Sequence, residues 1–203
     1  PFTGGDKQSF YDQLYERVYD YNGTPLRKAL NDAGLYYSRT DNKGPWGGTP
    51  GSDDDTQHIM CRQSYSILMT DGYWSEDSAS QAQTAAARSN NDGSTSNNQT
   101  ISKPGGTSYV YAATGPFSDN RSYTLADVAM YYWKRDLRTD LDNLVPTSPI
   151  NPAFWQHMVT FGVGLGVQGS VNPTTAFNAI SNNAAVSWPD PSGSEPAKID
   201  DLL

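Results

Sequence analysis

The sequence SYSILMTDGYW, residues 64–74, runs from a short apolar stretch directly into an acidic residue, a glycine and two aromatic residues. The apolar part predicts a β-strand over residues 64–70, because a short apolar run bounded by turn signals is typical of a buried strand. Asp71 then stands at the carboxyl end of this strand, where ligands bind in open α/β sheets. Asp71-Gly72 is equally a signal for a tight hairpin turn, so both interpretations of Asp71 remain open at this point.

Capping residues and apolar stripes predict helices over residues 9–20, 25–33 and 125–138. For the second helix, Thr24 is a good N-cap and Gly34 suits the C-terminal stop. N-capping alone therefore explains why a threonine stands before Pro25 and the predicted helix. Any further role for this residue has to come from its surroundings.

The second predicted strand lies in HMVTFGVGLGV, residues 157–167, whose β-branched and aromatic residues are typical of a strand buried on both faces. NPTTAFNAISN, residues 172–182, predicts a short helix after it. Helices that alternate with apolar strands favour an α/β domain, in which an open parallel sheet carries helices on both faces. Two strands alone cannot form a stable open sheet, so we expect its first strands to precede Pro1.

Polar segments interrupt this pattern. Residues 38–58 carry repeated Gly and Pro and predict an exposed loop. Residues 77–121 are rich in Ser, Asn, Gln, Thr and Gly, which predicts a poorly buried insertion with a short strand or hairpin at SYVYAA, residues 108–113. The Pro- and Gly-containing tail, residues 187–203, predicts a linker toward a following domain. The predicted domain is thus residues 1–186.

The charge and composition exclude several classes of protein. The chain has 203 residues and a net charge of −8, without a Lys/Arg block, so the basic surface of a nucleic-acid binder is missing. No apolar stretch is long enough to predict a membrane-spanning helix. Cys61 is the only cysteine, which excludes an internal disulfide and a multi-cysteine zinc site. The chain starts with Pro1 and shows no export signal, so we expect a processed chain or a segment of a longer one.

Residues 164–169 match the pattern G-x-G-x-x-G directly after an apolar strand, as in dinucleotide-binding enzymes. The acidic residue expected about 20 positions later is not convincing, and Asn172-Pro173 delay the next helix. The alternative function is therefore an enzymatic one, that of a nucleotide-dependent oxidoreductase.

Other groups of reactive residues have simpler interpretations. Residues 92–96 match D-x-S-x-S but follow no strand, so we interpret them as a chance match. Residues 53–55 are three aspartates without the alternating spacing of a calcium loop. His58, His157 and Cys61 belong to no hydrolase motif, so the sequence contains no catalytic constellation.

GTPLRKAL, residues 23–30, followed by LMTDGYW, residues 68–74, resembles parts of the metal-ion-dependent adhesion site of a von Willebrand factor type A domain. More narrowly, TLADVAMYYWKRDLRTDL, FWQHMVTFGVGLGVQG and the closing KIDDLL resemble the type A-like N-terminal region of the PilY/PilC family, exported proteins associated with type IV pilus tips. The resemblance covers residues 9–37, 59–76 and 122–203.

The resemblance implies a cation site with Thr24 and Asp71 as metal ligands. In type A domains these two positions work together with a D-x-S-x-S motif after the first strand, and no such motif precedes Thr24 here. Hydroxyl and carboxylate oxygens suit hard cations, so the implied cofactor is Mg²⁺, Mn²⁺ or Ca²⁺. The site is incomplete within these residues.

The resemblance also implies a function: a non-enzymatic adhesion or scaffold module of a pilus-tip protein that supports pilus assembly and surface attachment. Its expected location is the cell surface, after export through the periplasm. The implied partners are minor pilus subunits, a C-terminal β-propeller of the same protein, and a host or abiotic surface. A third alternative is a structural domain whose metal site is degenerate.

Overall fold

The computed structural model describes residues 3–16, 23–54, 57–75, 85–93 and 98–202. The helices in these ranges are α1 (Gly4–Tyr15), α2 (Leu26–Tyr37), α3 (Leu125–Trp133), α4 (Pro173–Asn182) and α5 (Glu195–Asp200). The strands are β1 (Tyr65–Thr70), β2 (Ile101–Ser102), β3 (Ser108–Tyr109) and β4 (Val159–Gly164). None of the described helices is long and apolar enough to cross a membrane.

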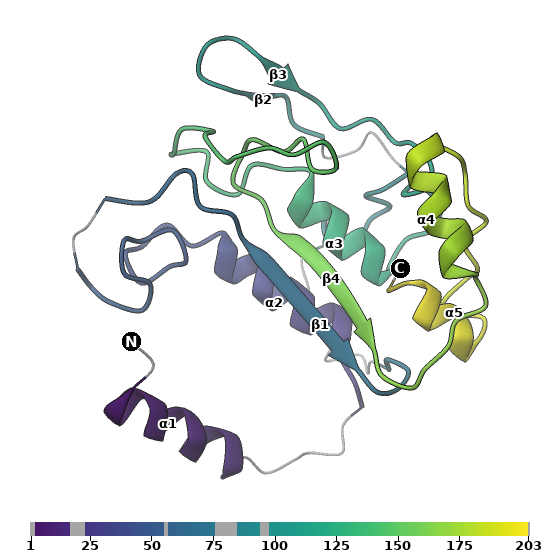
Figure 1. The fold of residues 1–203 in the computed structure, drawn as a ribbon, viewed down its shortest axis with the longest axis horizontal. Helices are drawn as coiled ribbons and strands as arrows, with labels where there is room; N and C mark the ends of the chain where they lie inside the picture. The colour runs from purple at the N-terminus through teal and green to yellow at the C-terminus, as the bar shows by residue number, and fades with distance from the viewer. Residues whose placement is uncertain (1–2, 17–22, 55–56, 76–84, 94–97, 203) are drawn as a thin grey trace.

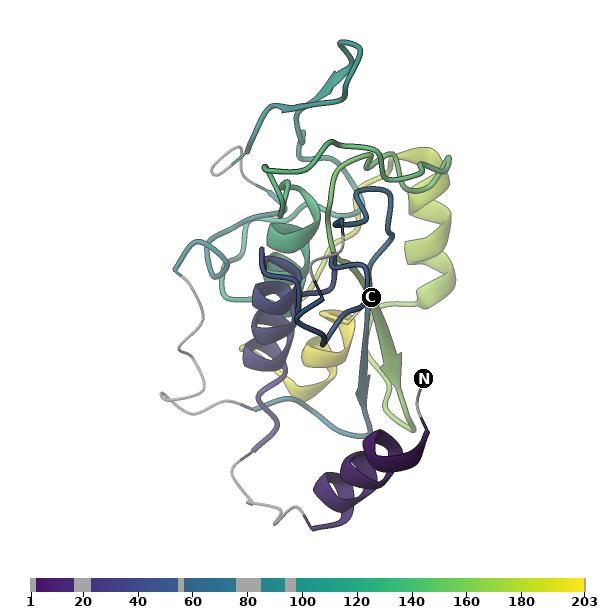
Figure 2. The same ribbon diagram turned by 90° about the vertical axis from the view of Figure 1, so that its left-hand side faces the viewer.

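β1 and β4 form a parallel pair in which Tyr65 lies opposite Val159 and Thr70 opposite Gly164. Figures 1 and 2 show α2 and α3 side by side on one face of this pair. The inward side chains of both strands pack there against the helices, and the core contains Leu30, Leu68, Val128, Tyr132 and Met158. The predicted mixed α/β class with a parallel pair is confirmed.

The outer face of the strand pair is open, which differs from the predicted strand buried on both faces. The parallel register places six apolar side chains on this face: Tyr65, Ile67, Met69, Val159, Phe161 and Val163. Ile67 is 66% exposed and Phe161 is 50% exposed. The prediction is wrong here because an apolar run indicates that burial of both strand faces is favourable. It does not show whether other residues of the chain pack against each face.

The predicted helices exist, with shifted ends. α2 continues through Gly34 to Tyr37, because Gly34 lies against the ring of Tyr132 in α3 and serves packing instead of a helix stop. α3 starts with the predicted capping box but ends at Trp133, before residue 138. α1 starts earlier than predicted and ends at Tyr15, and residues 17–20 of that prediction lie outside the described residues.

The insertion contributes more to the core than its composition predicts. β2 and β3 pair as an antiparallel hairpin, as expected near residues 108–113. Ile101 of β2 is buried, as are Ala87 and Tyr111 outside the hairpin, and Tyr109 of β3 stacks on Trp155 with ring centroids 4.8 Å apart. A few aromatic and aliphatic residues thus anchor an otherwise polar segment.

The tail beyond residue 186 also packs against the rest of the chain instead of forming a loose linker. Trp188 donates its indole N–H to the carbonyl of Pro116 at 2.6 Å. Ala197 and Ile199 of α5 are buried. The described tail is therefore part of the same packed body, while the position of a domain boundary stays a prediction.

Candidate functional site

Asp71 lies directly after β1, at the rim where the carboxyl ends of both parallel strands meet. The hydroxyl of Thr70 donates to the carbonyl of Gly72 at 2.8 Å and accepts from its N–H at 3.2 Å, so Thr70 shapes the turn. β1 pairs with β4 in parallel, and the hairpin interpretation of Asp71-Gly72 is therefore wrong. Asp71 is exposed and its carboxylate faces solvent at this rim.

Thr24 reaches the same loop through its backbone. Its N–H and carbonyl each bond Ser75 at 3.1 Å, as an isolated antiparallel bridge. The predicted N-cap role of Thr24 is wrong, because α2 starts at Leu26 with Pro25 as its N-cap residue. The structure thus brings Thr24 to the loop that Asp71 begins. A cation shared by the Thr24 hydroxyl and the Asp71 carboxylate stays a prediction.

Positive charges lie behind this rim. The guanidinium of Arg27 lies 4.6 Å from the ring centroid of Trp74, and the ammonium of Lys198 lies 5.5 Å from it. The indole N–H of Trp74 also donates to the carbonyl of Lys198 at 3.2 Å. Trp74 follows Asp71 by three residues, so both cations contact the segment that Asp71 begins. A cation there needs further anionic ligands besides Asp71.

Across the described ranges, no three carboxylate, histidine or cysteine side chains are arranged to hold a metal ion. Thr24 and Asp71 alone would leave most coordination positions of Mg²⁺ to water or to other groups. This agrees with the missing D-x-S-x-S motif. The described residues thus supply at most part of such a site.

At the end of the glycine pattern of residues 164–169, Gly169 lies directly against the carboxylate of Asp200. The Asp200 carboxylate accepts hydrogen bonds from the N–H of Ser170 and of Val171, both at 2.9 Å, and from the Ser170 hydroxyl at 2.5 Å. A phosphate at this end of the pattern would meet the carboxylate of Asp200. This arrangement argues against the dinucleotide-binding alternative.

The other reactive side chains have structural partners. His58 contacts Asn42 at 3.1 Å and Arg138 at 2.7 Å through its two ring nitrogens. His157 contacts the carbonyl of Trp155 at 2.6 Å and the amide of Asn151 at 3.0 Å, and burial lowers its pKa. Both histidines are thus fixed by their neighbours.

Cys61 is a free, exposed thiol. In the aspartate run, Asp53 forms an ion pair with Lys43 at 2.8 Å on the surface, and Asp55 lies outside the described residues. Neither feature adds a ligand to the rim around Asp71. The sequence interpretation of residues 53–55 as an acidic loop is compatible with this exposed ion pair.

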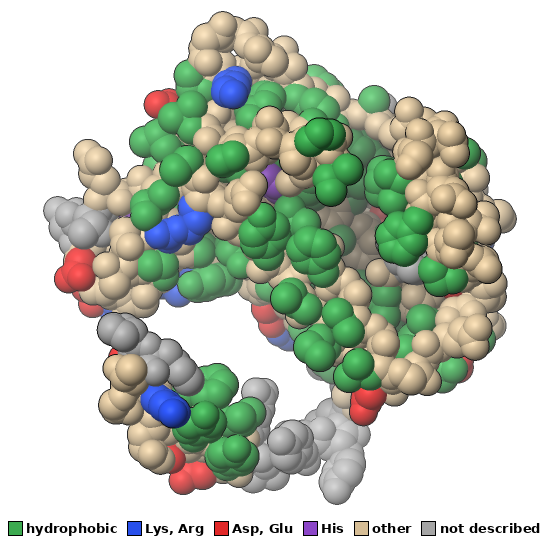
Figure 3. Space-filling model, in the orientation of Figure 1, with side chains coloured by type: hydrophobic (Ala, Val, Ile, Leu, Met, Phe, Trp, Pro, Cys, Tyr) green, Lys and Arg blue, Asp and Glu red, His purple; other side chains and the backbone are tan. Residues whose placement is uncertain are grey.

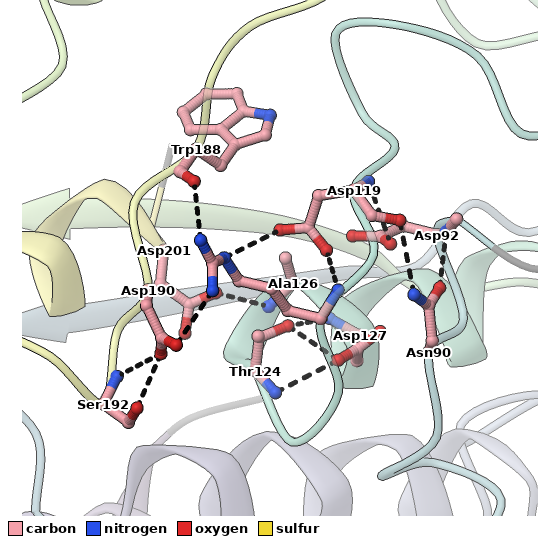
Figure 4. Close-up of polar contacts among 12 residues, drawn as sticks. Asn90, Asp92, Asp119, Thr124, Ala126, Asp127, Trp188, Asp190, Ser192 and Asp201 are labelled. Carbon is pink, nitrogen blue, oxygen red and sulfur yellow. Dashed lines mark hydrogen bonds and ion pairs between the residues drawn. The ribbon is translucent and has the colours of Figure 1, made fainter.

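A second polar feature surrounds the start of α3 and includes four carboxylates (Figure 4): Asp92, Asp119, Asp127 and Asp201. Asp127 completes the capping box by accepting from the N–H of Thr124 at 3.1 Å. Asp201 accepts from the first two N–H groups of α3, those of Leu125 at 2.7 Å and Ala126 at 3.1 Å. The α3 N-terminus is thus capped from two directions.

Burial dominates the electrostatics of this acidic cluster. It raises the pKa of Asp92 to about 7, and the neighbouring Asp127 and Asp119 add to the increase. Burial also raises the pKa of Asp127 to about 6 and that of Asp201 to about 7. The ammonium of Lys134 is fully buried nearby and donates to a backbone carbonyl at 2.7 Å. The cluster can therefore change charge near neutral pH.

Sequence reasoning found only part of this cluster. The capping box of Thr124 and Asp127 has a local signal, which predicted the start of the helix. The D-x-S-x-S match gives no signal for the role of Asp92, and only its burial, at 3% exposure, shows that this role is structural. Asp201 lies far from α3 in sequence, and no local pattern indicates that contact.

Comparison with known proteins finds relatives named "Type IV pilus biogenesis factor PilY1" in Pseudomonas aeruginosa. The protein of strain PAK is 36% identical over 224 aligned residues, which include 99% of this chain and 18% of the relative. The protein of strain PAO1 is 34% identical, and the alignment again includes 99% of this chain and 18% of the relative. That of strain UCBPP-PA14 is 35% identical over 170 residues, covering 76% of this chain and 13% of the relative.

This chain thus spans less than a fifth of the length of these curated relatives. No family model matches the chain. No solved structure matches it either.

Proposed function

This chain is homologous to a region of the type IV pilus biogenesis factor PilY1, and on that premise we propose that it is a non-enzymatic adhesion and scaffold module of a pilus-associated protein. The single observation that carries the proposal is the identity of about a third along nearly the whole chain. The module would act at the cell surface, at the pilus tip. Its partners there would be minor pilus subunits, further domains of the same protein, and the surface to which the cell attaches.

The proposed architecture is a von Willebrand factor type A-like domain. β1 and β4 would be two adjacent strands of its larger open sheet, with α2 and α3 as the cover of one face. Their parallel order and the position of Asp71 after β1 support this assignment. The open outer face of the pair is compatible with a sheet and helices that residues outside this sequence complete.

Within this architecture, the rim around Thr24 and Asp71 is the proposed site of a divalent cation, which would be Mg²⁺, Mn²⁺ or Ca²⁺. The support is the pairing of Thr24 with Ser75, which holds two distant segments at the carboxyl end of β1. Such a cation would offer an open coordination position to an acidic group of a partner. The chain's own hydroxyl and carboxylate would orient the ion.

A second candidate is a structural module with a degenerate cation site. The specific observation in its favour is the pair of cationic side chains, Arg27 and Lys198, close to the ring of Trp74. They would supply the positive charge that a metal ion otherwise brings. The module would then support pilus assembly without a cation.

Isothermal titration of the full-length protein with Mg²⁺ and Mn²⁺ separates the two candidates. If the cation site exists, Asp71→Ala should weaken binding by about tenfold or more, the loss expected for one carboxylate ligand. Asp32→Ala is the matched control, since Asp32 is an exposed carboxylate on α2 that pairs with Lys28. Equal affinities for the two variants and the unmodified protein would remove Asp71 from the site and favour the structural candidate.

A further inference from the structure

One buried arginine holds the base of the loop over residues 39–58. Arg138 follows α3 in the chain and is 1% exposed. One of its terminal nitrogens, Nη1, donates to the carbonyl of Arg39 at 3.2 Å, and the other, Nη2, lies 2.7 Å from Nδ1 of His58. Residues 55 and 56 of the loop lie outside the described ranges. Arg138 thus connects the start of the loop to its end.

The contact with Arg138 fixes the protonation state of His58. A guanidinium carries hydrogen-bond donors and no acceptor, so Nδ1 of His58 has to accept this bond with its lone pair. The ring proton is then on Nε2, which donates to the side-chain oxygen of Asn42 at 3.1 Å. The structure thus contains His58 as a neutral imidazole in one defined tautomer.

The charges around His58 disfavour a second ring proton. Asp140 accepts from Nε of Arg138 at 2.8 Å and from Nη2 at 2.7 Å, and these hydrogen bonds lower the pKa of Asp140. The Arg138–Asp140 pair is neutral as a whole, so it attracts an imidazolium only weakly, whereas a proton on Nδ1 would face a guanidinium N–H. The other charged side chains of the described loop are exposed: Arg39, Asp41, Lys43, Asp53 and Asp54.

The middle of the loop is held by groups whose charge does not change near neutral pH. Trp46 is fully buried, and its indole N–H donates to the carbonyl of Tyr37 at 2.6 Å. Arg62 donates to the carbonyls of Pro45 and Gly47. In the described part of the loop, His58 is the side chain of the type that titrates between pH 5 and 8. A change of pH in this range therefore acts on the base of the loop.

The second histidine of the chain, His157, belongs to a separate network. The side-chain oxygen of Asn151 accepts from the indole N–H of Trp133 at 3.2 Å, so the NH₂ group of Asn151 faces Nε2 of His157 at 3.0 Å. His157 is thus also a neutral acceptor, and burial lowers its pKa. Figure 3 shows only a small patch of histidine surface on the face drawn there. His157 should gain a proton at lower pH than a free histidine, which separates its response from that of His58.

We propose that His58 is an acid-sensitive switch: a proton on Nδ1 breaks the hydrogen bond with Arg138 and releases the base of loop 39–58 from the segment after α3. The closed state binds one proton fewer than the open state. It is therefore stable above about pH 6.5, where a free imidazole is neutral, and weakens as the pH falls through this value. The loop thus changes shape between neutral and mildly acidic surroundings. This inference does not depend on the cation predicted at Thr24 and Asp71.

Hydrogen exchange of the full-length protein at about pH 7.5 and about pH 5 tests the switch, after correction for the chemical exchange rate at each pH. The peptide spanning residues 40–54 should open about 30-fold more at the lower pH, the increase expected when one imidazole gains its proton only in the open state. The peptide spanning α3, residues 125–133, should not lose protection. Equal protection of residues 40–54 at both pH values, or an equal loss in α3, would overturn the proposal.

Two variants assign the response to the contact between His58 and Arg138. In His58→Asn, the amide oxygen can accept from Arg138 in place of Nδ1 and gains no proton in this pH range, so the loop should stay closed at both pH values. Asn42→Ala is the matched control, because it removes only the partner of Nε2 and should keep the pH response. Protection of α3 at about pH 7.5 checks that both variants fold. A response in His58→Asn as large as that of the unmodified protein would refute the role of His58.

Discussion

Gly34 of α2 lies directly against the ring of Tyr132 of α3: a Cβ atom at position 34 would come within 2.4 Å of the ring carbons. The hydroxyl of Tyr132 is fixed by a hydrogen bond to Asn31 at 2.9 Å, also on α2. The ring therefore cannot turn away without losing a buried bond. The close approach of α2 and α3, which supports the inner face of the sheet, depends on this glycine.

We expect Gly34→Ala to destabilise the fold by about 1–3 kcal/mol, because the added methyl group overpacks the contact with Tyr132. Gly5→Ala in α1 is the control, since no atom lies within 4 Å of its added Cβ. Urea unfolding followed by circular dichroism measures both. A Gly34→Ala protein as stable as the control would show that the two helices can separate at little cost.

The acidic cluster predicts how stability depends on pH. Burial raises the pKa of Asp92 to about 7, so the folded state holds a proton that the unfolded state releases near pH 4. The contribution of Asp92 to the free energy of unfolding should therefore fall as pH rises from about 4 to 7. We expect Asp92→Asn to flatten this slope and to add on the order of 1–3 kcal/mol at pH 8.

Thermal and urea unfolding between pH 4 and 8 check this expectation. Asp32→Asn on the surface of α2 is the control and should keep the slope of the unmodified protein. Asp127 and Asp201 contribute in the same direction, because burial raises both pKa values as well. A slope that Asp92→Asn leaves unchanged would contradict the assignment of Asp92 as buried and protonated, whereas the net slope also includes the opposite contribution of the buried His157, whose pKa is lowered.

Asp200 should be more important for stability than an exposed aspartate with similar contacts. Its carboxylate accepts three hydrogen bonds in a buried position, and an asparagine has only one oxygen to replace them. Asp200→Asn should cost about 2–4 kcal/mol. Asp190 accepts from the N–H and hydroxyl of Ser192 on the surface, so Asp190→Asn should cost less than about 0.5 kcal/mol.

Both Asp200 and Asp190 variants can be compared by thermal melting at pH 8. A second measurement, hydrogen exchange of the peptide around Ser170, reports the local effect directly. Faster exchange there in Asp200→Asn but not in Asp190→Asn is the expected pattern. Similar melting temperatures and similar exchange in the two variants would show that Asp200 is not needed to hold this loop.

The tip of the β2–β3 hairpin is the part of the insertion that can change without disturbing the core. Residues 103–107 are exposed, whereas Ile101 and Tyr111 on either side are buried. Replacing residues 103–107 by a two-residue Asn-Gly turn should leave the melting temperature within about 2 °C. If the hairpin presents the adhesive surface of the proposed module, cells with this variant should attach less.

Attachment of piliated cells to glass and to host cells measures that effect, with surface pili counted in parallel. A conservative Lys103→Arg variant is the control for the charge at the tip. Normal attachment with normal pilus numbers would place adhesion elsewhere on the module. Loss of the pili themselves would assign the tip to assembly instead of adhesion.

The features that the sequence predicted correctly have local signals. The capping box at Thr124 lies three residues from Asp127, and the strand that ends at Thr70 is one continuous apolar run. Such patterns depend on neighbours along the chain. They predicted the existence of α2, α3, β1 and β4, although the ends of the helices moved.

The features that the sequence did not predict depend on contacts between residues far apart in the chain. Asp201 caps α3 from 76 positions away, and Asp200 holds Ser170 from 30 positions away. The composition of residues 187–203 predicts a linker, because Pro and Gly occur there at close intervals. Thr24 shows the same limit: its local environment predicts an N-cap, whereas its backbone pairs with Ser75, 51 positions later.

The six outward apolar side chains of β1 and β4 also have a consequence for the colloidal behaviour of these 203 residues when they are prepared alone. An uncovered sheet face offers copies of the chain a surface on which to stack. The net charge of −8 keeps copies apart by repulsion over about 10 Å at 0.1 M salt. Added salt shortens this range, so clustering of the isolated piece should increase with ionic strength, opposite to the behaviour of complexes that ion pairs hold together.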